Sequence, residues 1–252
     1  MKAKISKEIE FFFKNMFFTQ KFLLKRRLKR AIKNNYEEEL SLLDQIVNKN
    51  YECIDVGVYR GVYSYKLSKI CNYVHSFEPN PLIFSYLNKN LKKIIKNMTL
   101  YNIALSNQEI ITDLRIPKRF ETANKKNYEE RYKLGAATIN KNNLLNNNDF
   151  IRIKVKTKKL DSIDLKKNIS FIKIDVEGHE KMVIEGAINL IKKNKPNILV
   201  EIEERHTKHK IEDTINFINQ LGYKSYFYRN KNLISTKKIN DFKSVNNFIF
   251  LN

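Results

Sequence analysis

The sequence predicts an α/β fold in which helices flank a mostly parallel seven-stranded sheet. From Leu40 onward, short apolar runs alternate with helical stretches, and this rhythm is typical of βαβ units. A chain of 252 residues with 42% hydrophobic residues can bury one core, which favours one domain with an extension over two full domains. Ligands of such sheets bind at the carboxyl ends of the strands, so residues that end strands are the functional candidates.

An N-terminal helical extension, residues 1–48, precedes the sheet. Its first 33 residues carry 11 Lys and Arg against 2 Glu, contain no Gly or Pro, and repeat apolar residues near helical spacing. They are therefore predicted to form one or two basic amphipathic helices. Two interpretations stay open. The helices contact an anionic membrane surface or a partner, or they pack on their own domain or a dimer mate and leave Lys and Arg in solvent.

The remaining domain, residues 49–252, contains seven predicted strands and four predicted helices. The strands are expected at Tyr51–Val56, Tyr73–Phe77, Met98–Ala104, Phe171–Val176, Asn197–Ile202, Tyr223–Tyr228 and Asn247–Leu251. The helices are expected at Tyr63–Ile70, Leu82–Ile95, Glu180–Lys193 and Ile211–Leu221. Residues 115–150 break the rhythm and are predicted to form an excursion or lid over the strand ends. Their flanks, Ile111–Ile116 and Ile151–Lys156, alternate apolar and polar residues and could pair as extra strands.

Two of the 6 glycines fall in the loop after the first strand, which reads Asp55-Val-Gly57-Val-Tyr-Arg-Gly61. Gly57 would let the backbone turn close to a ligand, and Gly61 would open the next helix. A dinucleotide site requires G-x-G-x-x-G, whereas here an Asp precedes G-x-x-x-G. A carboxylate at this position would repel a pyrophosphate but suits a ligand that bears an amino group.

The next two strand ends extend the same predicted site. Glu78 follows the glycine loop by about 20 residues, the position of an acid that binds both ribose hydroxyls of a nucleoside. Asn102 ends the third strand, where it and the small residues after it could border an adenine. S-adenosylmethionine meets all of these demands, so Asp55, Gly57, Gly61, Glu78 and Asn102 are predicted to bind this cofactor.

A second strand-to-helix segment reads Lys173-Ile-Asp175-Val-Glu177-Gly178-His179-Glu180, and Pro196-Asn-Ile-Leu-Val-Glu201 lies on the next strand. Together with the glycine loop and Phe77-Glu78-Pro79, these residues resemble the FkbM family of S-adenosylmethionine-dependent methyltransferases. One departure from the family pattern is Tyr59-Arg60, where the loop usually has a small residue or Asn. The resemblance implies a class I methyltransferase (Rossmann-like) fold and, in many relatives, O-methylation of sugars or other small hydroxylated molecules.

The resemblance assigns Asp175, Glu177 and His179 to the active-site segment, and Asp175 also to the cofactor. Methyl transfer depends largely on alignment and needs a base only for the hydroxyl proton, for which His179 is the candidate. In the alternative, Asp175 and Glu177 are the working acids and His179 caps the helix. Asp175 and Glu201 end adjacent strands, which leaves a divalent metal as a weaker option, and no metal site is predicted.

The expected acceptor is a sugar, a glycan or another small molecule. The formal net charge of +21 favours a nucleic-acid (RNA) methyltransferase as an alternative, but the fourth strand ends in D-V-E-G rather than in a segment that would stack a flipped base. A non-catalytic binding protein with a degenerate methyltransferase fold is a third reading. No stretch approaches ~18 uninterrupted apolar residues, and 2 Cys are too few for a disulfide framework. A cytoplasmic protein is therefore expected, with oligomerisation and contact of residues 1–33 with the inner face of a membrane left open.

Overall fold

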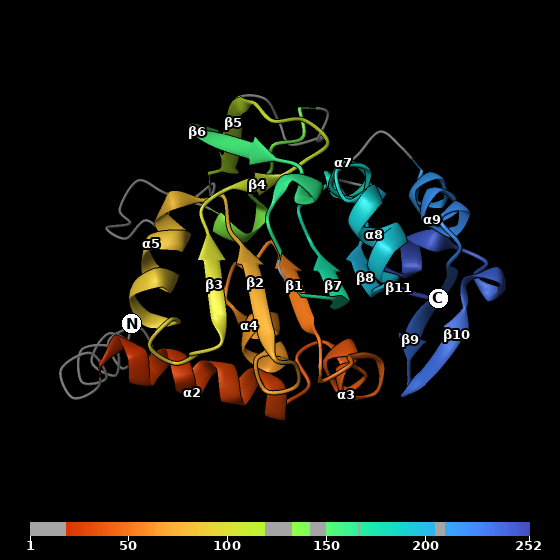
Figure 1. Cartoon of the computed structure of the whole chain (residues 1–252), viewed down its shortest axis with the longest axis horizontal. Helices are drawn as coiled ribbons and strands as arrows, with labels where there is room; N and C mark the ends of the chain where they lie inside the picture. The colour runs from red at the N-terminus through yellow and green to blue at the C-terminus, as the bar shows by residue number, and fades with distance from the viewer. Residues whose placement is uncertain (1–18, 119–132, 142–149, 166, 205–209) are drawn as a thin grey trace, which may run out of the picture.

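Two sheets form the framework of the computed structural model, which describes residues 19–118, 133–141, 150–165, 167–204 and 210–252 (Figure 1). The larger sheet has eight strands in the order β10-β9-β11-β8-β7-β1-β2-β3. Their bounds are β1 Glu52–Val56, β2 Tyr73–Phe77, β3 Met98–Tyr101, β7 Ile169–Ile174, β8 Asn197–Glu201, β9 Lys224–Arg229, β10 Asn232–Ser235 and β11 Asn247–Leu251. The chain order reverses at β1, which pairs in parallel with both β2 and β7, so the switch point lies at the end of β1.

The predicted count of seven strands was wrong by one, although each predicted strand corresponds to a strand of this sheet. The additional strand, β10, pairs antiparallel with β9 through a two-residue turn at Asn230 and Lys231. Both turn residues have positive φ, +52° and +62°, as in the hairpin turns that usually contain glycine. Because no glycine marks this turn, the sequence pattern did not reveal the hairpin.

Helices cover both faces of the large sheet (Figure 1). Their bounds are α2 Gln20–Lys33, α3 Leu43–Ile46, α4 Val62–Leu67, α5 Pro81–Asn90, α7 Glu180–Glu185, α8 Ile188–Asn194 and α9 Ile211–Gln220. The single helix predicted at Glu180–Lys193 was wrong, because the chain breaks there into α7 and α8. A Cβ on Gly186, at the break, would lie 2.1 Å from the carbonyl oxygen of Ser106. The break therefore lets the chain pass closely over the strand that Ser106 follows.

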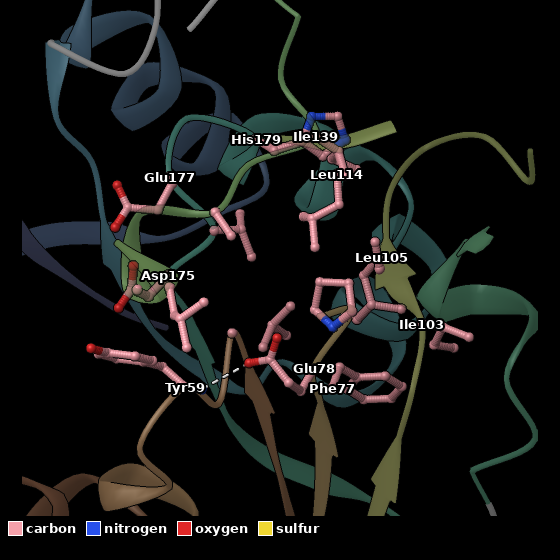
Figure 2. A pocket seen from close by; sticks show the side chains of 18 residues that line it. Tyr59, Phe77, Glu78, Ile103, Leu105, Leu114, Ile139, Asp175, Glu177 and His179 are labelled. Carbon is pink, nitrogen blue, oxygen red and sulfur yellow. Dashed lines mark hydrogen bonds between the residues drawn. The ribbon is translucent and has the colours of Figure 1, made fainter. Parts of the chain in front are cut away.

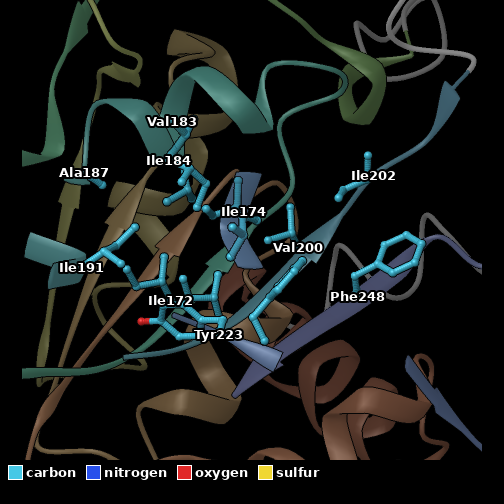
Figure 3. Close-up of a cluster of buried hydrophobic side chains, with 14 of the residues drawn as sticks. Ile172, Ile174, Val183, Ile184, Ala187, Ile191, Val200, Ile202, Tyr223 and Phe248 are labelled. Carbon is cyan, nitrogen blue, oxygen red and sulfur yellow. The ribbon is translucent and has the colours of Figure 1, made fainter. Parts of the chain in front are cut away.

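Each face of the sheet has its own apolar core. Ile172, Ile174 and Val200 point toward α7, α8 and α9 and pack with Phe248 of β11 (Figure 3). On the other face, α4 and α5 pack over Cys53 and Val74, and Leu24 and Leu28 of α2 belong to the same cluster. Residues 20–33 of the predicted extension therefore pack on their own domain. Residues 1–18 lie outside the described part of the chain.

A smaller sheet lies beyond the carboxyl ends of β1, β2 and β3 (Figure 1). It consists of β4 Ala104–Leu105, β5 Ile111–Pro117 and β6 Phe150–Lys158, in the order β4-β6-β5. The predicted pairing of the excursion's two flanks is confirmed, since β5 and β6 run antiparallel from Ile111↔Lys156 to Pro117↔Phe150. Between them, residues 119–132 and 142–149 lie outside the described chain, whereas residues 133–141 return along β5 through the Arg115↔Thr138 bridge. Within the described residues, no helix is long and apolar enough to cross a membrane.

Candidate active site

One cavity lies at the carboxyl ends of β1, β2 and β7, beneath the smaller sheet (Figure 2). Among its lining residues are five of the predicted site residues: Gly57, Glu78, Asp175, Glu177 and His179. Figure 2 shows Glu78 and His179 on opposite sides of the cavity, with Asp175 and Glu177 along a third side. The structure therefore brings both predicted motifs to one place.

Glu78 ends β2 and is held by backbone amides on both carboxylate oxygens. Its Oε2 accepts from the Tyr59 N–H and its Oε1 from the Asn80 N–H, each at 2.9 Å. The residue is only 4% exposed, and this burial raises the pKa of Glu78 to about 7 despite the two amide donors. The two amides thus fix the carboxyl group of Glu78 as a hydrogen-bond acceptor, while burial disfavours its ionised form unless a cation lies nearby.

Three predicted cofactor residues lie outside the cavity lining. Asp55 is buried behind it, where its Oδ2 accepts from Ser64 Oγ at 2.5 Å. Burial raises the pKa of Asp55 to about 6. Gly61 begins α4 and packs against Leu91. Asn102 donates to the carbonyls of Glu78, at 2.9 Å, and Pro79, at 3.1 Å. These three residues therefore lie behind the cavity lining, where Asp55 adds negative charge and Gly61 and Asn102 support the backbone.

The glycine loop is shaped by close contact with the end of β7. A Cβ on Gly57, whose φ is +87°, would lie 1.8 Å from the carbonyl oxygen of Asp175, so Gly57 is required for packing between two strand ends. Two residues later, Tyr59 adopts a φ of +45°, a left-handed conformation that Asn tolerates better than Tyr. Tyr59 nevertheless adopts this conformation, in which its N–H donates to Glu78.

The turn after β7 carries Asp175, Glu177 and His179 and has a strained backbone. Glu177 has a φ of +56° and Gly178 a φ of +95°. Two side chains from residues 133–141 hold this turn. Thr138 Oγ1 donates to the Glu177 carbonyl at 2.8 Å, and Asn140 Nδ2 donates to the Gly178 carbonyl at 2.7 Å. The excursion thus fixes the predicted catalytic segment through hydrogen bonds to its main chain.

His179 occupies the N-cap position of α7, but its side chain does not cap the helix. Glu180, the first residue of α7, stabilises the turn before the helix, because its Oε1 accepts from the N–H groups of Val176, at 3.3 Å, and Gly178, at 2.9 Å. The His179 Nε2 lies 2.9 Å from Ser106 Oγ. Burial lowers the pKa of His179 to about 4, so the imidazole is neutral at pH 7.

A buried ammonium group connects the two acids that the sequence suggested as a weak metal pair. Lys173 Nζ lies 3.8 Å from Asp175 Oδ2 and 3.9 Å from Glu201 Oε2, and 5.0 Å from the centre of the Tyr63 ring. Burial lowers the pKa of Lys173, but the carboxylates of Asp175 and Glu201 more than offset this effect and raise it. Tyr63 in turn donates to Glu37 at 2.5 Å. Among the residues that the structure describes, no group of three or more His, Cys, Asp or Glu side chains could hold a metal ion.

Apolar residues complete the cavity, and motif analysis missed most of them. Ile103 and Leu105 line one wall, while Leu114, Leu134 and Ile139 come from β5 and residues 133–141. The alternating pattern of β5 was the signal for Leu114, but it indicates a strand and not what the apolar face of that strand covers. No sequence pattern marked Leu134 or Ile139. The wall formed by Ile103 and Leu105 lies beside Glu78 (Figure 2).

This arrangement suits a ligand that carries positive charge and a flat apolar part. Asp55, Glu78 and Asp175 lie near the glycine loop, where the ammonium group of Lys173 is 3.8 Å from Asp175. A cationic ligand would favour the ionised forms of Asp55 and Glu78, whose pKa values burial has raised. The apolar wall at Ile103 and Leu105 could contact a ring.

A family model and several solved structures match this chain. The family model described as Methyltransferase FkbM domain matches residues 55–225. A methyltransferase FkbM from Methylobacillus flagellatus KT has a TM-score of 0.51 at 14% identity, and the match covers 87% of this chain and 52% of that chain. This chain therefore spans about half the length of that protein. No curated protein matches the chain.

Two further solved structures show lower similarity. A protein from Streptococcus mutans in complex with SAH has a TM-score of 0.48 at 12% identity, with 85% of this chain and 95% of that chain covered. An rRNA methylase from Streptococcus thermophilus has a TM-score of 0.44 at 10% identity, with 85% and 93% covered. The family match itself spans well over half of this chain and includes both motifs of the cavity. The chain therefore belongs to the FkbM family of methyltransferases.

Proposed function

We propose that this protein uses S-adenosylmethionine to methylate a hydroxyl group of a sugar, a glycan or another small molecule. One observation carries the proposal: a cavity at the switch point has a buried acid, Glu78, on one side and a neutral imidazole, His179, on the other. The acid suits a cationic nucleoside, and the imidazole can accept a proton. Family membership supplies the reaction class.

The cofactor would be held by the polar side of the cavity. Glu78 would accept from its ribose hydroxyls, and the wall at Ile103 and Leu105 would contact its base. Asp175 would face its positive charge, and the buried carboxyl of Asp55 would add negative charge from behind the lining. When bound, S-adenosylmethionine supplies a methyl carbon activated by the sulfonium. The protein then has to align the acceptor hydroxyl and remove its proton.

A hydrogen-bonded chain supports His179 as the group that takes this proton. Asn107 Nδ2 donates to Glu185 Oε2 at 2.7 Å, which turns Asn107 Oδ1 toward Ser106 Oγ, 3.4 Å away. If the Ser106 hydroxyl donates to Asn107, it accepts from His179 Nε2–H. The lone pair of neutral His179 then lies on Nδ1, the nitrogen that would receive the proton. Asp175 and Glu177 would orient the acceptor through its other hydroxyls.

The apolar side chains from β5 and residues 133–141, together with the carboxylates of Asp175 and Glu177, favour a small hydroxylated acceptor. Leu114, Leu134 and Ile139 can contact the C–H surfaces of a sugar, and Asp175 and Glu177 can accept from its hydroxyl groups. An anionic phosphate next to Asp175 and Glu177 would be repelled. The site therefore favours a small-molecule acceptor over RNA.

Titration calorimetry and methyl-transfer assays test the proposal. The full chain should bind S-adenosylmethionine, and labelled methyl should appear in glycan or small-molecule extracts rather than in RNA or DNA. His179→Gln should reduce kcat by about a hundredfold to ten-thousandfold with unchanged cofactor affinity, and Ser106→Ala should reduce kcat less. Absence of cofactor binding overturns the methyltransferase proposal, and label confined to RNA overturns the acceptor class. Full activity of His179→Gln with loss in Asp175→Asn would transfer the base role to the acid.

A further inference from the structure

The strongest charge segregation in the described chain lies far from the cavity. Seven Lys and Arg side chains between Lys21 and Lys33 are exposed on α2, and four exposed lysines between Lys89 and Lys96 follow from the end of α5. Helices α2 and α5 are in contact. These eleven side chains are called the basic face below.

No acid interrupts the basic face. The sequence contains no Asp or Glu at residues 19–36 or 79–108, and none of the eleven cations makes an ion pair within the described residues. The acids that follow α2 are engaged elsewhere. Glu37 accepts from Tyr63, Glu38 accepts from the Asn230 N–H, and Asp44 pairs with Lys66. If the basic face reflected only the general excess of lysine in the chain, some Asp and Glu residues would be expected among these positions. Their absence needs a separate explanation.

The geometry of α2 gives the basic face a flat support. Its 14 residues span about 21 Å, and Leu23, Leu24 and Leu28 are buried. The helix is thereby docked lengthwise on the body with its cations outward. Phe22, near its first turn, is 48% exposed among these cations. Clusters of basic residues on an amphipathic helix are typical of surfaces that bind anionic lipids.

We propose that the basic face binds an anionic lipid bilayer. In Figure 1, α2 lies at the end of the sheet where β1, β2 and β3 begin, and the cavity lies where these strands end. A polyanionic substrate should be bound around the cavity that modifies it, so the remote position argues against RNA as the occupant. Anchoring does not require contact with the cavity. The cavity would then open away from the bilayer, and the acceptor would enter from the aqueous side.

Vesicle co-sedimentation of the full chain tests this proposal. At physiological ionic strength, the protein should bind vesicles that contain about one third phosphatidylglycerol and should not bind pure phosphatidylcholine. A variant with Lys21, Lys25, Arg26 and Lys29 all changed to Gln should lose at least about tenfold in affinity, since each basic residue near an anionic surface contributes measurably. Its thermal midpoint and S-adenosylmethionine affinity should match those of the wild type, which separates loss of the surface from unfolding.

A matched variant controls for net charge. Arg152, Lys154, Lys156 and Lys158, changed to Gln, remove the same four charges from exposed positions of β6, beside the cavity. This variant should keep vesicle affinity within about twofold. Equal losses in the two variants, or no binding of the wild type to anionic vesicles, would overturn the proposal. Binding of RNA that depends on the α2 cations, without binding of vesicles, would assign the face to RNA instead.

Discussion

The two sides of the cavity are built from different chemistry. On the side of β1 and β2, buried acids and a glycine that admits no Cβ fix a polar surface, with Glu78 held by two amides. On the side of β5 and residues 133–141, apolar side chains form the wall, and Thr138 and Asn140 hold the neighbouring turn only through its carbonyls. Side-chain identity is therefore essential on the first side, whereas on the second side shape and hydrogen bonding to the backbone matter more. Substitutions on each side should separate these two modes.

The largest effect is expected at Gly57, on the first side. Gly57→Ala places a Cβ 1.8 Å from the Asp175 carbonyl oxygen at a φ of +87°, and we expect a loss of about 3 kcal/mol or more in the free energy of unfolding. Gly222→Ala is the control, because its φ is also positive, +96°, but its Cβ meets only the flexible end of Lys195 at 3.2 Å. Urea unfolding of both variants measures the difference. Equal losses would show that backbone conformation, rather than contact between the strand ends, determines the requirement for Gly57.

Glu78→Gln should weaken the binding of S-adenosylmethionine while the fold persists. A hydrogen bond to a charged group contributes about 1.5–3 kcal/mol, so calorimetry should show about a tenfold to hundredfold rise in Kd. Glu52→Gln is the matched control, since Glu52 is also a buried acid but pairs with His75 at the opposite end of β1. An unchanged Kd in Glu78→Gln would remove Glu78 from the cofactor site.

On the second side, Thr138→Val should affect the acceptor rather than the cofactor. The substitution keeps the shape and removes the donor to the Glu177 carbonyl. A loss of about 1 kcal/mol in positioning would raise the acceptor KM about fivefold and leave the Kd of S-adenosylmethionine unchanged. Thr157→Val removes a similar buried hydroxyl, bonded to the Gln108 carbonyl at 2.7 Å, and should not change the acceptor KM. Parallel changes in cofactor Kd and acceptor KM would contradict the division into two sides.

The smallest effect concerns the pH dependence of stability. Burial raises the pKa of Asp55 to about 6 and those of Glu78 and Glu180 to about 7. Between pH 5 and pH 8 the unfolded chain has already lost these protons, so raising the pH favours unfolding. We expect a net fall in the free energy of unfolding of about 1 kcal/mol or less, since the lowered pKa of His179 and the decline in excess positive charge act in the opposite direction over part of the same range.

Thermal unfolding at both pH values, with and without S-adenosylmethionine, measures this effect. The cofactor should stabilise the protein more at pH 8, because its positive charge favours the ionised acids. Glu78→Gln should show a shallower pH dependence. A wild-type protein that gains stability from pH 5 to pH 8 would contradict this assignment.

Motif spacing predicted the first side of the cavity better than the second. Glu78 and Asp175 follow buried strands directly, so the topology of a parallel sheet brings them together. Asp55, near the end of β1, and Asn102, directly after β3, also lie at strand ends, yet the structure turns them toward Ser64 and toward the carbonyls of Glu78 and Pro79. Sequence position specifies the end of a strand but not the direction of the side chain. Thr138 could not be found at all, because its role depends on a long-range pairing with Arg115.

The position of β11 has a consequence for how much of the chain can fold alone. The family match ends at residue 225, whereas β11, Asn247–Leu251, is hydrogen-bonded to β8 on one side and to β9 on the other. An excised fragment of residues 55–225 would cut through β1 and β9, and it would lack β11 together with Leu24 and Leu28 of α2 from the second core. The segment that defines the family by sequence is therefore smaller than the cooperative folding unit, and truncations should keep residues 19–252.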